Sequence, residues 1–505
     1  MGAINRRRSL ALGHVNGMLW SVGNGLTTGT LVNYLAIDLG ASGLAFSLVL
    51  ASPQIVSALR VAAPTLIRQI GTAKRTCLLL SLVSYLLIWG LPAIGLPNLL
   101  PRAHALWALI ALLAAHQLFE AVASAALWAW FADLIPSAVR GRYIGRRQAL
   151  QLVVLVPALL ASGWFADSWR KHHSQPSGAS AAPSRTATNA PQNGQQLLGY
   201  AIPNAVGAAF LLASLVPLLW MPVSDARVVR HLAAAAPRST VRATSTPEID
   251  EPSAPPRWWA ALGDPAFRRL LWYGCWLSLF NGLGQAAQNI YPKAVLHLGV
   301  LPLDIMRTGM RVGQIGVSVW AGQVADRFGN RPLVVATQLA LLAAPVFYLA
   351  STPAEPYWLA GAWACFAMYA ALNVALYNLL IKLAPRGAAA AYIAVYFGVT
   401  GAAYAGATVA GGWLFDALNP QAAVPSAFAW LAAIEASCAE IGERLAALGI
   451  DRYQAIFGIV IAARLIGLVL AARLLEPGAW RWWAILRGRP PVDRAPPVGG
   501  ARAQS

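Results

Sequence analysis

Long apolar segments recur along the whole chain and are separated by short polar stretches rich in arginine. A run of about 18 apolar residues or more can cross the ~30 Å hydrocarbon layer of a membrane as a helix. The strict alternation of apolar and polar residues that marks a membrane β-barrel is not found in the sequence. The pattern predicts twelve spans, at residues 12–36, 43–66, 76–96, 104–133, 148–168, 198–221, 267–292, 301–325, 332–351, 357–384, 389–416 and 454–475.

Three polar segments interrupt this pattern. Residues 222–266 are rich in Pro, Ala, Ser and Arg, cannot bury a core and are expected to form a flexible cytoplasmic linker. Residues 170–197 are expected to form an external loop, and residues 426–448 an amphipathic helix outside the membrane. The predicted domains are an N-terminal six-helix bundle at 1–221, the linker at 222–266, a C-terminal six-helix bundle at 267–479 and a cytoplasmic tail at 480–505.

The composition agrees with a membrane protein. Of the 505 residues, 58% are hydrophobic and 11% are charged, whereas about a quarter of a soluble chain is charged. The net charge of +19 comes from basic residues in short segments between apolar runs. This arrangement is typical of cytoplasmic loops and not of a nucleic-acid-binding domain. It predicts a multi-pass protein of the inner membrane with both termini in the cytoplasm.

No sequence motif points to a metal, a cofactor or ATP. The four cysteines lie far apart and form no CxxC pair, so neither a metal site nor a disulfide framework is expected. The Walker sequence GxxxxGK[ST] is not found, which argues against an ATP-driven pump in one chain. We therefore expect no metal and no cofactor.

The two halves of the chain repeat each other. Residues 24–26 (Asn-Gly-Leu) recur at 281–283, an offset of 257, and Tyr143 recurs as Tyr392 at an offset of 249. A consistent register over several spans, interrupted only by changes in loop length, is explained by a six-helix repeat. Repeats of this kind place a substrate site at their interface, near the middle of the membrane.

A charged motif with two glycines follows the eighth predicted span. Residues 322–331 read Gly-Gln-Val-Ala-Asp-Arg-Phe-Gly-Asn-Arg. Here the chain resembles the major facilitator superfamily of secondary transporters, whose signature GxxxDRxGxR it matches at every fixed position. The matching residues are Gly322, Asp326, Arg327, Gly329 and Arg331. The copy at 64–71, after the second span, keeps the second glycine but lacks the aspartate.

The resemblance implies an all-α membrane protein with about twelve transmembrane helices, arranged as two pseudo-symmetric six-helix bundles around a central cavity. The charged loop is expected to act in gating. Its glycines permit a tight turn, and Asp326 can then lie at the N-terminus of a helix of the other half, near Arg146 or Arg147. The alternative is a charged loop that only sets the topology.

Polar side chains follow one face of several spans. In the seventh span they recur at i, i+4, i+7 and i+8, which places them on one side of a helix. The resemblance implies that helices one, four, seven and ten line the cavity, and interhelical hydrogen bonding is the alternative for each amide. The candidate substrate-cavity residues are Asn24, Asn281, Gln285, Gln288, Asn289, Arg307, Arg311, Tyr369, Asn373 and Tyr377.

Charged residues within the spans are expensive to bury and therefore indicate function or a partner. Arg311 lies near the middle of the eighth span, and we expect it, with Arg307, to bind a negative group on the substrate. A structural pair with Glu120 or Asp304 is the alternative. Arg464 in the twelfth span is expected either to snorkel at a lipid-facing position or to pack against a partner.

Glu120, near the middle of the fourth span, is the candidate proton-coupling residue, because a buried carboxylate can be tuned by desolvation and by an approaching arginine. His116, one helical turn away, is expected to assist. Drug/proton antiporters carry an arginine in this span that the chain lacks, and of their glycine-rich fifth helix it keeps Pro157 and little else. Both departures count against a standard drug antiporter.

These features together predict a secondary active transporter that moves a small polar organic solute, either neutral or anionic, by alternating access, coupled to an ion or a proton. The expected partners are the small-molecule substrate and membrane lipids, with no nucleic acid, and the expected state is a monomer. The alternatives are a drug or metabolite efflux antiporter, and a transport-fold sensor or lipid translocase that moves no water-soluble solute. A membrane enzyme is not expected, because the few acids and histidines within the spans are scattered.

Overall fold

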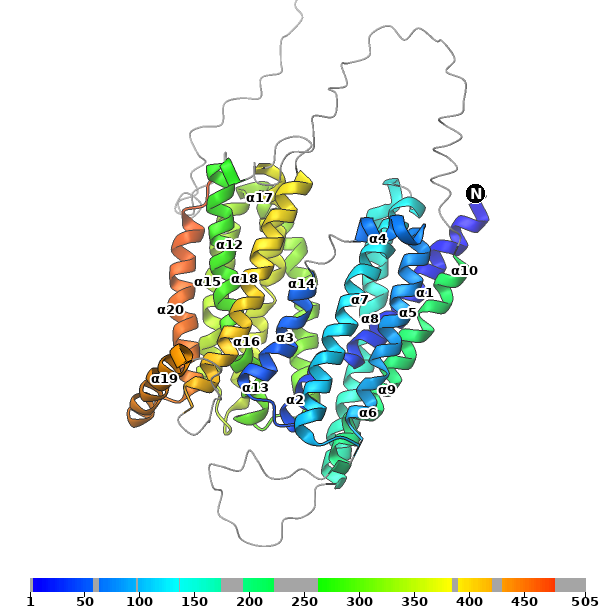
Figure 1. The fold of residues 1–505 in the computed structure, drawn as a ribbon. Coiled ribbons are helices and arrows are strands. Elements are labelled where there is room, and N and C mark those ends of the chain that lie inside the picture. Colours follow the sequence, from blue (N-terminus) through cyan, green and yellow to red (C-terminus); the bar gives the residue numbers. More distant parts are fainter. Residues whose placement is uncertain are drawn as a thin grey trace, which may run out of the picture. The chain divides into compact units, whose positions relative to one another are not determined.

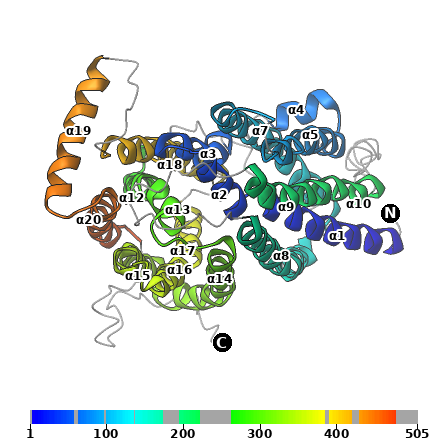
Figure 2. The same ribbon diagram turned by 90° about the horizontal axis from the view of Figure 1, so that it is seen from below.

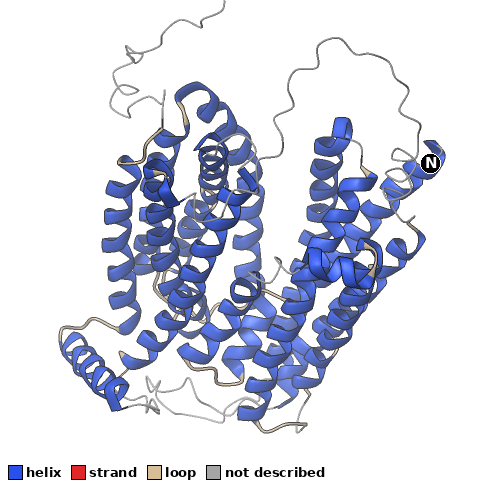
Figure 3. Ribbon diagram, turned by 45° about the horizontal axis from the view of Figure 1, so that its top comes forward, coloured by secondary structure: helices blue, strands red, loops and turns tan. Residues whose placement is uncertain are grey.

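The computed structural model describes residues 3–57, 63–96, 99–135, 137–173, 194–221, 262–383, 389–419 and 429–476. All regular secondary structure in this part of the chain is helical (Figure 3). The predicted fold class, an all-α membrane protein, is confirmed. The predicted linker and external loop fall mostly outside the described residues, and the predicted tail falls wholly outside them.

The first half forms long helices, several of which are divided into two pieces (Figure 1). Gly29, with a φ of 79°, separates α1 from α2, and Gly71, with a φ of 103°, separates α4 from α5. These φ values favour glycine because a Cβ atom would clash with the backbone. The helices are α1 (Ala3–Thr27), α2 (Thr30–Asp38), α3 (Gly43–Ser57), α4 (Ala63–Ile70), α5 (Ala73–Ile88), α6 (Gly90–Ile94), α7 (Arg102–Leu134), α8 (Ser137–His173), α9 (Gly194–Ala213) and α10 (Leu215–Trp220).

The second half follows the same plan and adds one helix. The predicted amphipathic helix is α19, which runs obliquely to α18 (Figures 1 and 2) and is tied to it by a hydrogen bond of 3.0 Å from Trp413 Nε1 to Glu435 Oε1. The helices are α12 (Pro265–Leu283), α13 (Gln285–Ala294), α14 (Val300–Phe328), α15 (Asn330–Ala350), η4 (Pro356–Trp358), α16 (Leu359–Phe366), α17 (Tyr369–Leu383), α18 (Ala389–Ala417), α19 (Ala429–Ala447) and α20 (Arg452–Ala472).

Seven helical segments of the described chain are long and apolar enough to cross a membrane. They are Ala73–Ile94, Arg102–Phe131, Tyr143–His173, Gln195–Trp220, Asn330–Ala350, Pro356–Leu380 and Arg452–Ala472. Each coincides with a predicted span. The other five predicted spans coincide with α1 and α2, with α3, with α12 and α13, with α14 and with α18. Two of these are interrupted, at Gly29 and at Gly284, and α14 carries several charged residues.

The chain divides into two compact units. Unit 1 comprises residues 1–251, 282–305 and 404–453, and unit 2 comprises residues 252–281, 306–403 and 454–505. Unit 1 therefore joins the helices of the first half to α13, to the start of α14 and to the end of α18. Within it, α1 packs against α8 and α9, and α5 packs against α7 (Figures 1 and 2). The two six-helix bundles, at 1–221 and 267–479, stay a prediction.

The sequence repeat has a counterpart in the helix packing. A Cβ atom at Gly25 would lie 2.3 Å from Leu155 Cδ1, and one at Gly282 would lie 2.6 Å from the backbone oxygen of Tyr404. Gly282 and Tyr404 follow Gly25 and Leu155 by 257 and 249 residues, the offsets of the sequence repeat. Glycine is needed at position 282 because the close atom there belongs to the backbone, whereas at position 25 the Leu155 side chain would have to move. Thus α1 packs on α8 in the register in which α12 packs on α18.

Candidate functional site

Unit 1 contains a cavity of about 150 Å³ between α1, α5, α7 and α8. Its polar lining includes Asn16, Trp20, Tyr85, Glu120, Arg147 and Gln151. The indole Nε1 of Trp20 donates a hydrogen bond of 2.9 Å to Glu120 Oε1. The candidate proton-coupling carboxylate therefore faces a polar cavity, and α1 and α7 together hold it there.

His116 lies apart from this cavity. Its side chain is 1% exposed and is not among the cavity-lining residues that the structure describes. Its Nδ1 lies 2.8 Å from the hydroxyl of Ser84, so the imidazole joins α7 to α5. The structure does not bring His116 together with Glu120 in one site, and its assisting role stays a prediction. Among the described residues, no group of three or more His, Cys, Asp or Glu side chains is placed to hold a metal ion.

Arg147 supplies a buried positive charge beside the cavity. It is 6% exposed, and its guanidinium lies 5.5 Å from the centre of the Trp128 ring. Its Nη2 donates to Asn16 Oδ1 at 3.1 Å, and its Nε donates to the backbone oxygen of Gly13 at 3.3 Å. Arg146, its neighbour in sequence, is exposed. Arg147 is thus held by α1, while its role as a partner of Asp326 stays a prediction.

A second polar cluster lies in unit 2 and combines two predicted cavity residues with Arg464. Asn281 Oδ1 accepts hydrogen bonds from the Tyr369 hydroxyl at 2.8 Å and from Arg464 Nη2 at 2.9 Å. Arg464 Nη2 also donates to the Tyr369 oxygen at 3.1 Å. Because Arg464 is 4% exposed, it packs against partners, and the lipid-facing position considered from the sequence is wrong.

The polar face predicted for the seventh span is divided between the two units. Asn281 belongs to α12 and to unit 2, whereas α13, which begins at Gln285, belongs to unit 1. In unit 1, Asn289 Nδ2 donates to the backbone oxygen of Gln285 at 2.9 Å, and its Oδ1 accepts from Asn33 Nδ2 at 3.3 Å. Gln288 is 8% exposed. The contact with Asn33 is interhelical, the alternative considered for the amides, whereas the contact with Gln285 lies within α13.

The remaining predicted cavity residues lie in varied surroundings. Asn373 and Tyr377 are exposed on α17, while Asn24 is half-buried on α1. Arg307 is half-buried on α14, and its guanidinium lies 5.3 Å from the centre of the Trp363 ring. Arg311 is half-buried one turn further along. Whether each of these residues binds substrate stays a prediction.

The predicted gating motif forms the end of α14 and the turn into α15. Gly329 has a φ of 94° and directly precedes α15, which explains the need for glycine at this position. Asp326 and Arg327 are exposed, and Gly322 is half-buried. The turn has the tight geometry that the motif predicts, and its gating role stays a prediction.

Glu476, which was not predicted as a functional residue, fixes this turn within unit 2. Its Oε2 accepts hydrogen bonds from the backbone N–H groups of Asn330 at 2.8 Å and Arg331 at 2.7 Å, the first residues of α15. Its Oε1 lies 2.7 Å from Lys382 Nζ. A carboxylate at a helix N-terminus satisfies unpaired N–H groups and interacts favourably with the helix dipole.

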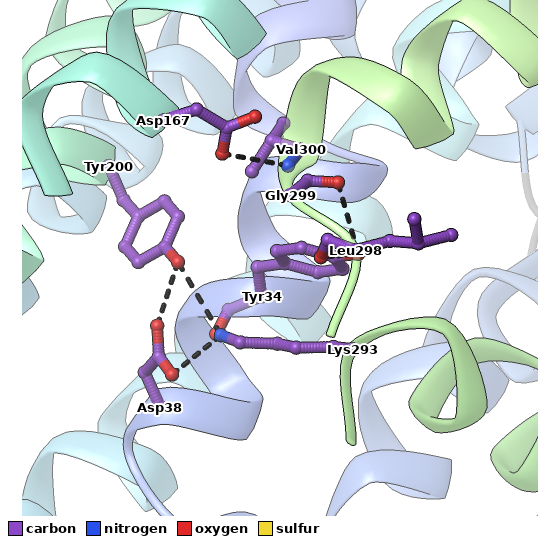
Figure 4. A network of polar contacts seen from close by, with 8 residues as sticks. All are labelled: Tyr34, Asp38, Asp167, Tyr200, Lys293, Leu298, Gly299 and Val300. Carbon is purple, nitrogen blue, oxygen red and sulfur yellow. Dashed lines mark hydrogen bonds and ion pairs between the residues drawn. The ribbon is translucent and has the colours of Figure 1, made fainter. Parts of the chain in front are cut away.

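Sequence reasoning also missed a buried ion pair in unit 1. Lys293 Nζ of α13 lies 2.5 Å from Asp38 Oδ1 of α2, and the two side chains are 9% and 2% exposed (Figure 4). The Tyr200 hydroxyl of α9 donates to Asp38 Oδ2 at 2.7 Å, and Lys293 donates to the backbone oxygen of Tyr34 at 2.9 Å. The pair ties α2 of the first half to α13 of the second.

Two aspartates cap helices in the same unit. Asp167, near the end of α8, accepts a hydrogen bond of 2.9 Å from the backbone N–H group of Val300 (Figure 4) and a second of 2.9 Å from that of Leu301. Val300 and Leu301 begin α14. Asp416, near the end of α18, accepts hydrogen bonds of 2.7 and 2.8 Å from the first two N–H groups of α3. The two aspartates are 249 residues apart, the offset at which Tyr143 recurs as Tyr392. The repeat was therefore the signal that could have identified them.

The helical fold and the apolar spans together indicate a multi-pass membrane protein. The family model described as Major Facilitator Superfamily matches residues 13–408. The chain belongs to this family, as the motif at 322–331 led us to expect. No curated protein sequence matches the chain at a significant level.

Solved structures of transporters resemble the whole chain. The nucleoside transporter NupG has a TM-score of 0.60 at 11% identity, with 93% of this chain and 98% of that chain covered. A D-xylose-proton symporter has a TM-score of 0.59 at 12% identity, covering 93% and 98%. A bacterial homologue of the human lysosomal transporter Spinster has a TM-score of 0.58 at 13% identity, covering 94% and 100%. At such identities the likeness shows the fold alone.

Proposed function

We propose that the protein is a secondary active transporter that moves a small polar organic solute by alternating access and couples this movement to protons. The proposal rests mainly on the position of Glu120. Its carboxylate lines the cavity of unit 1 and accepts the hydrogen bond from Trp20. An ionisable group at membrane depth is costly unless it has partners or water, and such groups commonly form proton relays.

Proton coupling at Glu120 has a physical basis in the cavity. When Glu120 is ionised, the Trp20 N–H group stabilises its charge, and the buried guanidinium of Arg147 lies in the same lining. When Glu120 takes up a proton, its oxygens become weaker acceptors, and the hydrogen bond from Trp20 of α1 weakens. Protonation therefore changes the interaction between α1 and α7, both of which the resemblance assigns to the substrate pathway.

The substrate class is supported by the polar cluster of unit 2. Asn281 and Tyr369 offer an amide and a hydroxyl, groups that suit a solute with hydrogen-bonding functions. Two of the structurally similar transporters, the nucleoside transporter and the D-xylose-proton symporter, are named for polar organic solutes. The buried positive charge of Arg464 in this cluster would repel a cationic solute.

The cellular setting belongs to the same proposal. We place the protein in the inner membrane as a monomer, with both termini and the linker in the cytoplasm, because the basic residues concentrate in the segments that this topology puts inside. Residues 1–221 and 267–479 form the two bundles that move against each other. In the alternative, a drug or metabolite efflux antiporter, the exported solute and the protons cross the membrane in opposite directions.

Proton-coupled flux in proteoliposomes tests the proposal. Purified protein is reconstituted with a pH-sensitive dye inside, and nucleosides, pentoses, amino acids and carboxylates are added outside. We expect at least one solute to change the luminal pH, with acidification in proton symport and alkalinisation in proton antiport. Glu120→Gln is expected to abolish this proton flux, and Glu443→Gln, a change at an exposed glutamate of α19, serves as the matched control.

Two results would contradict the proposal. Proton-driven accumulation that persists in Glu120→Gln would place the coupling site elsewhere. Flux of none of the water-soluble solutes by the wild-type protein would favour the sensor or lipid translocase alternative, which movement of a fluorescent lipid between the two leaflets would then identify.

A further inference from the structure

Arg464 of α20 is buried with part of its guanidinium unbonded. It is 4% exposed, and its Nη2 donates to Asn281 and to Tyr369. Its Nε and Nη1 atoms are buried, and within the described part of the chain no atom accepts a hydrogen bond from either. A guanidinium keeps its charge at any physiological pH and offers five donors in a rigid plane. Two of its three nitrogens are therefore available for a ligand.

The described surroundings of Arg464 supply no negative charge. Its hydrogen-bond partners Asn281 and Tyr369 are neutral, and the preceding residue, Ala463, accepts from the indole of Trp276. The described acids of unit 2 are engaged or exposed elsewhere: Glu476 caps α15, Glu355 binds Trp358, Asp264 caps α12 and Asp326 lies exposed at the end of α14.

A buried charge without a counter-charge is unfavourable in an apolar span, so an anion that reaches it gains more than it would in water. The two available nitrogens suit the oxygens of a carboxylate or a phosphate, because N–H groups of arginine form short, strong bonds with such oxyanions. Asn281 and Tyr369 lie on α12 and α17, the seventh and tenth predicted spans. The cluster therefore connects Arg464 to the polar faces predicted to line the substrate pathway.

We propose that Arg464 binds an oxyanion group of the transported solute, while Asn281 and Tyr369 hold its guanidinium in position. This inference rests on the proposed transport function and narrows the substrate to an organic anion. It assigns to Arg464 the role that the sequence suggested for Arg311.

Ligand-induced thermal stabilisation of the purified full-length protein tests the site without any need for transport. The probes are acetate, succinate, citrate and phosphate, with acetamide and succinamide as neutral counterparts and phosphatidylglycerol as an anionic lipid. We expect at least one soluble oxyanion to raise the melting temperature in a saturable manner and the neutral amides to have no effect. Arg464→Gln should weaken the apparent affinity by roughly tenfold or more.

Arg473→Gln is the matched control, because Arg473 follows α20 and is exposed. It should keep the full response to the oxyanion. Asn281→Asp keeps the test decisive if Arg464→Gln fails to fold. It places a carboxylate where Asn281 Oδ1 now lies, 2.9 Å from Arg464 Nη2. We expect this variant to melt at a higher temperature without ligand and to lose the oxyanion-induced shift.

Three results would each overturn the inference. In the first, no soluble oxyanion stabilises the wild-type protein, and in the second, phosphatidylglycerol alone stabilises it. In the third, both Arg464→Gln and Asn281→Asp respond to the oxyanion like the wild type. Failure of this site differs from failure of the proposed function. Proton-coupled flux of a neutral solute that Arg464→Gln leaves unchanged would remove the anion site and keep the transporter. If the protein moved none of the solutes but still bound an oxyanion through Arg464, the anion site would be kept and the proposed transport function would be lost.

Discussion

Asp167 and Asp416 occupy the same position in the two halves of the repeat, and each caps a helix of the opposite half. Asp167 binds the first N–H groups of α14, and Asp416 binds those of α3. The capped residues also correspond, since Val300 follows Gly43 by 257 residues. Both contacts lie within unit 1, at helix ends that the charge distribution predicts to be outside the cytoplasm. A pair of equivalent caps thus links the two halves at one end.

Removal of either charge should weaken this link. Asp167→Asn and Asp416→Asn each keep one acceptor oxygen but lose the charge that interacts with the helix dipole. We expect each to lower stability by about 0.5–2 kcal/mol, the range measured for the loss of helix caps. Thermal unfolding in detergent measures the effect, and Glu443→Gln is the control. Two variants as stable as the wild type would show that the caps contribute nothing to the stability of the protein.

The fold was predictable from the sequence because spans and repeats are properties of composition and register. The proximity of Asn281 and Tyr369 was also expected, since the resemblance assigns their helices to one cavity. The burial of Arg464 against protein was not predictable, because the sequence of α20 is mostly apolar and does not show which side of the helix faces protein. The pair of Asp38 and Lys293 joins residues 255 positions apart that have no repeat counterpart, so only the tertiary structure reveals it.

The ion pair of Asp38 and Lys293 gives a second prediction. Because both side chains are buried, removal of either partner leaves the other charge poorly compensated, although Arg170 also interacts electrostatically with Asp38. Asp38→Asn and Lys293→Met should each destabilise the protein by about 3–5 kcal/mol, whereas the double variant should recover most of this loss. A double-mutant cycle of thermal unfolding measures the coupling. Strict additivity of the two single effects would mean that the pair is not coupled in solution.

Close packing at the α12 and α18 contact gives a third prediction. In Gly282→Ala the new Cβ atom would lie 2.6 Å from a backbone oxygen of Tyr404, so one helix must shift, at a cost of about 1–3 kcal/mol. Gly309 of α14 has no atom within 4 Å of the corresponding position. Gly309→Ala should therefore be neutral or stabilising by up to about 1 kcal/mol. The yield of monodisperse protein after heating compares the two, and equal losses would contradict the packing argument.

The hydrogen bond from Trp20 to Glu120 gives a prediction about pH that a purely structural role would not produce. Trp20→Phe keeps an aromatic ring in the cavity but removes the N–H group that stabilises the ionised carboxylate. Proton-coupled flux in proteoliposomes should then depend on pH differently from that of the wild type, because the ionised carboxylate has lost this donor. Trp220→Phe, at a tryptophan that is 67% exposed, should leave the profile in place. A Trp20→Phe protein that transports more slowly with an unchanged pH profile would mean that Trp20 shapes the cavity without acting on the proton site.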